Sequence, residues 1–85
     1  MKSLKILYFA GLRERLGQGS EELELPAEVS DVAALRDLLA ARGGPWESLL
    51  TLRNLRYAVN QQMARLDSPV CAGDEVAFFP PVTGG

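Results

Sequence analysis

One stretch of this sequence has the residue spacing of an amphipathic helix several turns long, and it limits the folds open to the chain. The stretch runs from residue 30 to residue 42, and Ser30 or Asp31 can cap its N-terminus. Its apolar side chains recur at helical spacing and form one stripe: Val32, Leu35, Leu38 and Leu39. The Gly-Gly-Pro sequence at residues 43–45 ends the helix. A helix with one apolar stripe must pack against another surface, which the rest of the chain has to supply.

Apolar and β-branched runs on both sides of this helix supply that surface as strands. Leu4–Ala10 reads as a strand buried on both faces or nearly so, and Glu21–Leu25 alternates polar and apolar residues up to Pro26. Strands are also expected after the helix, at residues 56–60, 63–66 and 75–79. This order predicts an α+β fold with the helix on one face of a sheet. The first and last strands, which are the most apolar, are expected to be central neighbours.

The segments between these elements carry turn and short-helix signals. Leu12 and Leu16, four residues apart, predict a helical turn before Gly17, and the apolar residues at 46–52 predict another. Asn60 is expected in a turn because asparagine tolerates a left-handed backbone. Cys71 lies in the apolar sequence PVCAG and is expected to be a small buried core residue.

Composition excludes several classes of function. Eighty-five residues form one small domain, and a net charge of -2 gives no basic surface for nucleic acid or a membrane. The absence of histidine removes Ser/His and Cys/His catalytic pairs and histidine-bearing zinc sites. The apolar run near the N-terminus is too short to span a bilayer, so a cytoplasmic location is expected. We therefore do not expect this chain to act as an enzyme without a partner.

The last six residues, PPVTGG, have a chemistry of their own. Pro80 and Pro81 have a fixed φ and no N–H, so they cannot extend a sheet and favour a stiff, extended departure. Gly84 and Gly85 have no side chains, so this segment can enter a channel too narrow for other residues. Its distinctive group is the terminal carboxylate, which needs activation before acyl transfer. Two interpretations stay open: a C-terminus presented to other enzymes, or a frayed end.

Three blocks of sequence resemble one known family along almost the whole chain. The blocks are AGDEVAFFPPVTGG at residues 72–85, ILYFAGLRERLG at residues 6–17 and AVN at residues 58–60. They are similar to the small subunits of molybdopterin synthase. The resemblance implies a β-grasp, ubiquitin-like domain at residues 1–79, followed by an extended diglycine tail at residues 80–85.

The resemblance also implies a role as a sulfur carrier. An ATP-dependent, ubiquitin-activating-like enzyme would adenylate Gly85, which follows Gly84, and a sulfur donor system would convert it to a thiocarboxylate. The tail would enter the large subunit of molybdopterin synthase and give its sulfur to a cyclic pyranopterin monophosphate. Two small and two large subunits would assemble. The chain itself would bind no cofactor, and the catalytic groups would lie on the large subunit.

Family members place partner contacts at positions that match several residues here. Phe9, Met63 and Phe79 are the expected apolar contacts, and Arg13 is the expected partner of a carboxylate. The tail residues are expected to bind within the partner: Pro80, Pro81, Val82 and Thr83. For each apolar residue a place in the core remains the alternative, and for Arg13 a solvated charge.

Three other functions remain open from the sequence. A thiamine-pathway sulfur carrier shares the fold and the ending, and a ubiquitin-like modifier uses the same diglycine to form isopeptides with lysine. A plain interaction module with an incidental tail is the third. Deletion of Gly85 separates the last from the others, because a carrier would lose sulfur transfer and keep its fold.

Overall fold

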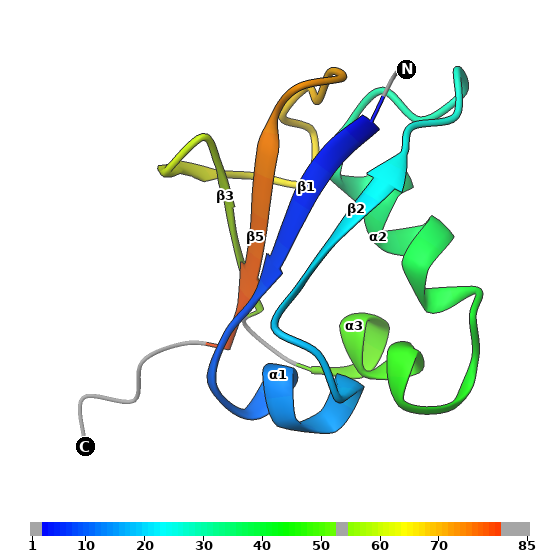
Figure 1. Ribbon diagram of the computed structural model, residues 1–85, viewed down its shortest axis with the longest axis vertical. Helices are drawn as coiled ribbons and strands as arrows, with labels where there is room; N and C mark the ends of the chain where they lie inside the picture. Colours follow the sequence, from blue (N-terminus) through cyan, green and yellow to red (C-terminus); the bar gives the residue numbers. More distant parts are fainter. Residues whose placement is uncertain (1–2, 53–54, 81–85) are drawn as a thin grey trace.

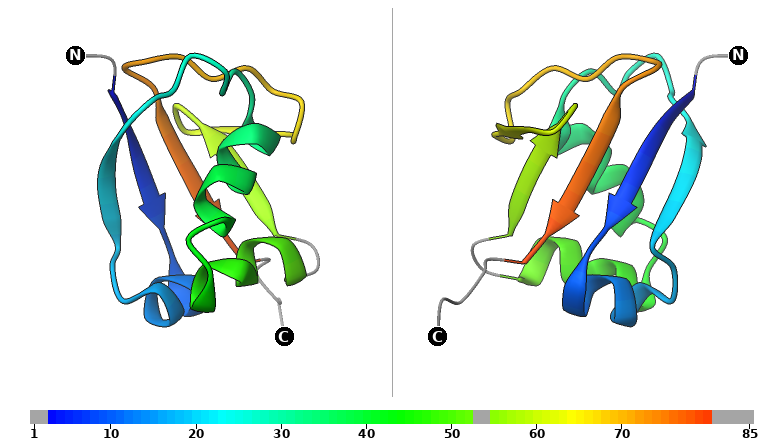
Figure 2. Two further views of the ribbon diagram at one scale, coloured as in Figure 1. Left: turned by 90° about the vertical axis from the view of Figure 1, so that its right-hand side faces the viewer. Right: turned by 60° about the vertical axis from the view of Figure 1, so that its left-hand side comes forward.

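Helices cover one face of a five-stranded mixed sheet and leave the other face open (Figures 1 and 2). The computed structural model describes residues 3–52 and 55–80. The elements follow in this order: β1 (Ser3–Tyr8), α1 (Ala10–Leu16), β2 (Ser20–Glu24), α2 (Val32–Ala40), the 3-10 helix η1 (Gly44–Glu47), α3 (Ser48–Thr51), β3 (Arg56–Val59), β4 (Gln62–Ala64) and β5 (Glu75–Phe79). The sheet order is β2-β1-β5-β3-β4, with β1 and β5 parallel and all other pairs antiparallel. The α+β prediction, with first and last strands as central neighbours, is confirmed.

The core lies between the helices and the covered face of the sheet. Alternation along the two central strands directs Leu4, Ile6 and Tyr8 of β1 and Val76 and Phe78 of β5 toward α2. These side chains meet those of α2, which are fully buried: Val32, Leu35 and Leu39. Each fully buried large apolar side chain contributes about 1.5–3 kcal/mol to stability. This packing fixes the sheet, and with it the positions of the side chains on the open face.

Two predicted helices are present in the structure, but one residue of the second helix is not buried as expected. The expected helical turn before Gly17 is α1, and the expected helix at residues 30–42 is α2, with Asp31 as its N-cap. The carboxylate of Asp31 accepts a 2.8 Å hydrogen bond from the Ala34 N–H. Leu38 is 37 % exposed, so its expected place in the buried stripe is wrong. Consecutive helical residues are about 100° apart, which places Leu38 at the edge of the contact that Leu35 and Leu39 make.

The strand boundaries also differ from the prediction. The expected strand at residues 4–10 ends at Tyr8, since Ala10 has a left-handed φ of 55° and begins α1. The strand is not buried on both faces, because Lys5 is exposed on the open side. The short strand expected at residues 63–66 lies at Gln62–Ala64 instead.

Turns at the far end of the sheet, opposite α1, correct the prediction for Cys71. Asn60 and Gln61 both have positive φ (52° and 69°) and form the two-residue turn between β3 and β4. The expected left-handed Asn60 is therefore confirmed. Cys71 begins the turn that leads into β5, and its N–H donates to the Asp74 carboxylate at 2.8 Å. That turn leaves the thiol exposed, so the buried position expected for Cys71 is wrong.

Candidate functional site

The open face of the sheet carries a line of apolar side chains that crosses four strands. Leu7 of β1 lies opposite Ala77 of β5, which lies opposite Ala58 of β3, which lies opposite Met63 of β4. Met63 is 64 % exposed. The line has no helix over it, because α2 and α3 lie on the other side of the sheet (Figure 2).

Two aromatic rings continue this line to the end of β5. Phe9 and Phe79 are in edge-to-face contact, with ring centroids 6.5 Å apart and planes at 79°. Phe9 is 46 % exposed and Phe79 is half-buried. We call this surface the apolar face and define it by six residues: Leu7, Phe9, Ala58, Met63, Ala77 and Phe79. Phe9 and Met63 are therefore not core residues, and the sequence prediction that they contact a partner remains a prediction.

An unusual backbone angle at Ala10 holds Phe9 in this place. Ala10 turns the chain from β1 into α1 with φ 55°, a region that costs an alanine about 1–2 kcal/mol relative to a right-handed conformation. The Phe9 N–H still donates to the Phe78 carbonyl at 3.3 Å, and the Phe9 carbonyl accepts from the Arg13 N–H at 3.4 Å. Backbone hydrogen bonds thus tie Phe9 to both β5 and α1, and they keep its ring beside that of Phe79.

The expected charged contact, Arg13, lies exposed on α1. Its side chain packs along the backbone of Gly19, where an added Cβ would lie 3.1 Å from the Arg13 Nε. Among the described residues it forms no ion pair, since the two present are Arg36–Asp37 and Arg42–Glu21. Its pairing with a partner carboxylate remains a prediction.

Part of the expected tail can be placed. Pro80 follows β5 directly and is half-buried, so the tail begins in the middle of the sheet, beside the apolar face. The other expected tail contacts lie outside the described residues: Pro81, Val82, Thr83, Gly84 and Gly85. The apolar face and the tail therefore start from the same strand end.

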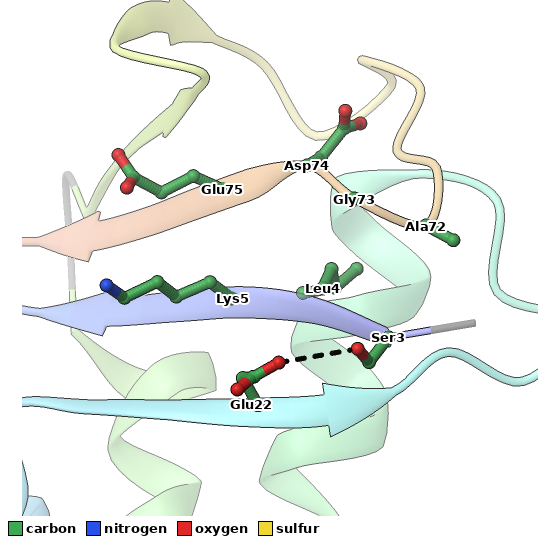
Figure 3. A pocket seen from close by; sticks show the side chains of 8 residues that line it. All are labelled: Ser3, Leu4, Lys5, Glu22, Ala72, Gly73, Asp74 and Glu75. Atoms are coloured by element: carbon green, nitrogen blue, oxygen red, sulfur yellow. Dashed lines mark hydrogen bonds between the residues drawn. The ribbon is translucent and has the colours of Figure 1, made fainter. Parts of the chain in front are cut away.

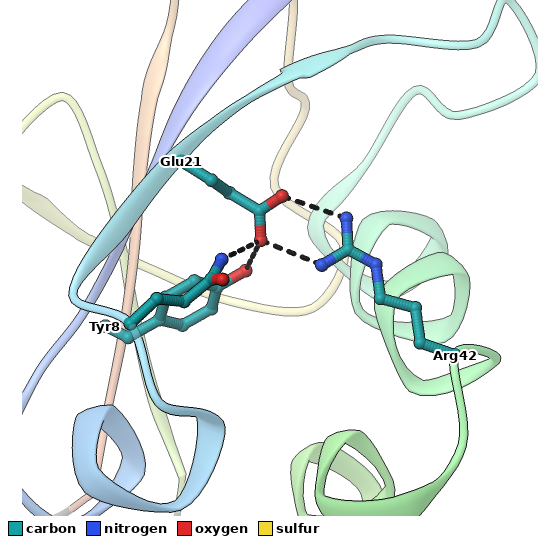
Figure 4. Close-up of polar contacts among 4 residues, drawn as sticks. Tyr8, Glu21 and Arg42 are labelled. Carbon is teal, nitrogen blue, oxygen red and sulfur yellow. Dashed lines mark hydrogen bonds and ion pairs between the residues drawn. The ribbon is translucent and has the colours of Figure 1, made fainter.

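A polar cluster on the helix-covered side was not expected from the sequence (Figure 4). Glu21 of β2 accepts hydrogen bonds from the Tyr8 hydroxyl (2.8 Å), the Gln18 amide (2.8 Å) and both terminal nitrogens of Arg42 (2.9 Å each). The Arg42 guanidinium also lies over the Trp46 ring, 4.4 Å from its centroid. The cluster joins β1, β2 and the residues that follow α2.

The charges in this cluster stabilise one another. Burial by itself would raise the pKa of the Glu21 carboxyl, but the hydrogen bonds from Arg42 and Tyr8 outweigh burial and hold that pKa below its usual range. Burial, followed by the bond to the Glu21 carboxylate, raises the pKa of Tyr8. Because Glu21 already accepts four hydrogen bonds, the cluster is best understood as a clamp between strands and helix.

The far end of the sheet carries a shallow groove whose lining is mostly polar (Figure 3). Lys5 of β1 lies between Glu22 of β2 and Glu75 of β5 in the sheet register. No polar side chain among the described residues is buried there. The described residues also contain no group of three or more His, Cys, Asp or Glu side chains placed to hold a metal ion.

Comparison with known proteins identifies the family. The family model described as "ThiS family" matches residues 6–85. The chain is 45 % identical over 82 residues to the molybdopterin synthase sulfur carrier subunit of Escherichia coli, covering 96 % of this chain and 99 % of that one. The chain belongs to the ThiS family. The resemblance stated from the three sequence blocks is therefore confirmed.

Solved structures show the same fold as this ThiS family member. Small archaeal modifier protein 1 of Haloferax volcanii superposes with a TM-score of 0.79 at 24 % identity, covering 96 % of this chain and all of that one. A chain in the complex of subunits 1 and 2 of molybdopterin-converting factor from Helicobacter pylori gives 0.67 at 20 % identity, covering 98 % and 99 %. The expected β-grasp fold is confirmed. No helix in the described part of the chain is long and apolar enough to cross a membrane.

Proposed function

We propose that this chain is the sulfur carrier of molybdopterin synthase and carries sulfur as a thiocarboxylate on Gly85. The observation that carries the proposal is the shared origin of the apolar face and the tail at the end of β5. Relatives that match nearly the whole chain are named molybdopterin synthase sulfur carrier subunits, which supports the same role here.

Activation would take place on a partner. An ATP-dependent adenylating enzyme would join the Gly85 carboxylate to AMP with loss of pyrophosphate, and sulfur from a donor system would then displace AMP. ATP would bind to that enzyme and no cofactor to this chain. These steps would occur in the cytoplasm. The side-chain-free Gly84 and Gly85 suit a narrow active-site channel.

Transfer would take place in the large subunit. The stiff Pro80-Pro81 pair would direct the tail into that subunit. There the thiocarboxylate sulfur would bond to a cyclic pyranopterin monophosphate, and water would then cleave the bond between this sulfur and the Gly85 carbonyl carbon, which regenerates the carboxylate. The Helicobacter pylori complex holds subunits 1 and 2 together, which supports a two-subunit assembly. Two small and two large subunits would form the working complex.

Docking would bury the apolar face against the large subunit. Phe9 and Met63 are exposed, Leu7 and Phe79 are half-buried, and the small Ala58 and Ala77 lie buried between them. Large apolar side chains exposed together on one surface of a small domain are typical of an interaction site. Phe79 and the neighbouring Phe9 lie next to the start of the tail at Pro80. Their burial against the large subunit would therefore fix where the tail enters that subunit. Met63 would anchor the opposite side of the contact.

Intact mass spectrometry tests the carrier chemistry directly. The chain is incubated with ATP, a matching activating enzyme and a sulfur donor, and we expect a mass gain equal to the exchange of one oxygen for sulfur, localised to Gly85. The chain without Gly85 should gain no mass and should unfold at the temperature of the intact chain, because the end adds little to the core. Absence of the gain, with an enzyme proven on another carrier, would refute the proposal. Isopeptides on lysine in its place would indicate a protein modifier.

A further inference from the structure

The open face of the sheet is acidic at the end away from the tail. Glu22 and Glu24 of β2 point outward on this face, and Glu75 begins β5 on the other side of β1. Asp74 immediately precedes Glu75, but its carboxylate accepts hydrogen bonds from the Cys71 N–H (2.8 Å) and the Asn60 amide (3.1 Å) and points away from Lys5 (Figure 3). Glu22 and Glu75 lie opposite Lys5 in the sheet register, and none of Glu22, Glu24, Glu75 and Lys5 forms an ion pair within the described residues.

The same face is basic at the end where the tail begins. Arg56 of β3 lies directly opposite Phe79 in the antiparallel register. Arg65, just after β4, lines one shallow groove together with Arg56 and Met63. Both arginines are exposed, and neither forms an ion pair with the described residues. The apolar face therefore lies between two regions of opposite charge.

The two charged ends are far enough apart to act independently. Glu75 and Phe79 are four residues apart on β5, which corresponds to about 13 Å along a strand. That separation exceeds the Debye length of about 10 Å at 0.1 M salt. A docking surface with two separate charged ends has a preferred direction, because a reversed approach would bring like charges together.

We propose that this charge polarity sets the orientation in which the chain docks on its partner. The proposal rests on the function proposed above and gives the chemistry of the large subunit's surface. That surface carries carboxylates beside the mouth of the channel that receives the tail, opposite Arg56 and Arg65. It carries Lys or Arg side chains at the other end, opposite Glu22 and Glu75. The apolar face supplies contact area, and the charged ends select the one orientation that points the tail into the channel.

A charge-swap variant tests orientation apart from net charge. Arg56→Glu combined with Glu22→Arg keeps the net charge of the chain and reverses the sign of one residue at each end. The matched control is Arg15→Glu, which changes the net charge by two. Arg15 lies on α1 and donates to the Ser48 hydroxyl at 3.3 Å, so it points toward α3 and away from the open face. Circular dichroism melts check that each variant is folded, and Arg56→Ala is the milder substitute if the swap unfolds.

Association with the cognate large subunit is then measured at several salt concentrations. At low salt the swap should slow association by about 10-fold or more, and the difference should shrink toward 1 M salt, because charges at the rim of an interface act mainly on the association rate. The control should stay within about 3-fold of the wild type. An association rate for the swap equal to the wild-type rate at every salt concentration would overturn the polarity proposal alone. Failure of the wild-type chain to bind the large subunit would overturn the proposed function as well.

Discussion

Replacing Met63 by alanine separates the docking role of the apolar face from its part in stability. Fully burying an exposed methionine side chain contributes about 1.5–3 kcal/mol. With 64 % of Met63 exposed before docking, about 1–2 kcal/mol of binding free energy depends on it. The dissociation constant for the large subunit should therefore rise by about 5- to 30-fold. The free chain should unfold at nearly its original temperature, because most of this side chain is already in water.

Leu50→Ala is a matched control for this experiment. Leu50 is 53 % exposed on α3, which covers the opposite side of the sheet from Met63 (Figure 2). Its loss should leave affinity unchanged in isothermal titration calorimetry or surface plasmon resonance with the large subunit. Equal affinities for the two variants would refute the assignment of the apolar face as the docking surface. A large drop in the melting temperature of Met63→Ala would instead mean that the side chain supports the fold.

Three further predictions concern the clamp and the turn beside Phe9. The pKa of Glu21 is held below its usual range, so the contribution of Glu21 to stability should be complete above the ordinary carboxyl pKa of about 4.3 and lost as pH falls through the depressed value. In Glu21→Gln the free energy of unfolding should therefore fall less steeply with decreasing pH than in the wild type. Parallel curves for the two proteins would contradict this. Tyr8→Phe should lower the free energy of unfolding, measured with denaturant, by about 1.5 kcal/mol. This value is near the lower limit for a hydrogen bond to a charged group, because Glu21 keeps its other donors. No measurable loss would contradict the role of the cluster as a clamp. Ala10→Gly should leave the free energy of unfolding unchanged or raise it by up to about 1 kcal/mol, because glycine adopts a positive φ without strain. Ala34→Gly, within α2, should lower the free energy of unfolding by about 1 kcal/mol. Equal losses in the two variants would disprove strain at Ala10.

The secondary structure was largely predictable because local patterns determine it. The helical spacing of Val32, Leu35 and Leu39, the alternation of β2 and the left-handed preference of Asn60 each depend on local sequence, and the structure follows them. The resemblance of residues 72–85 to a known family also predicted that the tail carries the chemistry, and this remains a prediction. What the chain presents to partners was harder to infer, since an apolar residue such as Phe9 can lie in a core or on a docking surface.

The features that the sequence did not predict depend on long-range contacts or unfavourable local choices. Glu21 and Arg42 meet only after β2 and the end of α2 pack together, so their spacing in the chain carries no signal. The left-handed φ of Ala10 runs against the preference of alanine, and only the bonds around Phe9 explain it. Cys71 has apolar neighbours in sequence, but its turn faces water.

The central place of β5 links completion of the fold to the appearance of the tail. β5 lies between β1 and β3 and supplies Val76 and Phe78 to the core, yet it is the last of the five strands to be synthesised. Until it leaves the ribosome, β1 and β3 have no shared neighbour, and much of the core stays open to water. The residues that follow β5 therefore leave the ribosome only after all five strands of this sheet have been synthesised. A partner that recognises the folded sheet would therefore act on chains that have completed it, and a chain cut before β5 would offer neither the closed sheet nor the residues that follow β5.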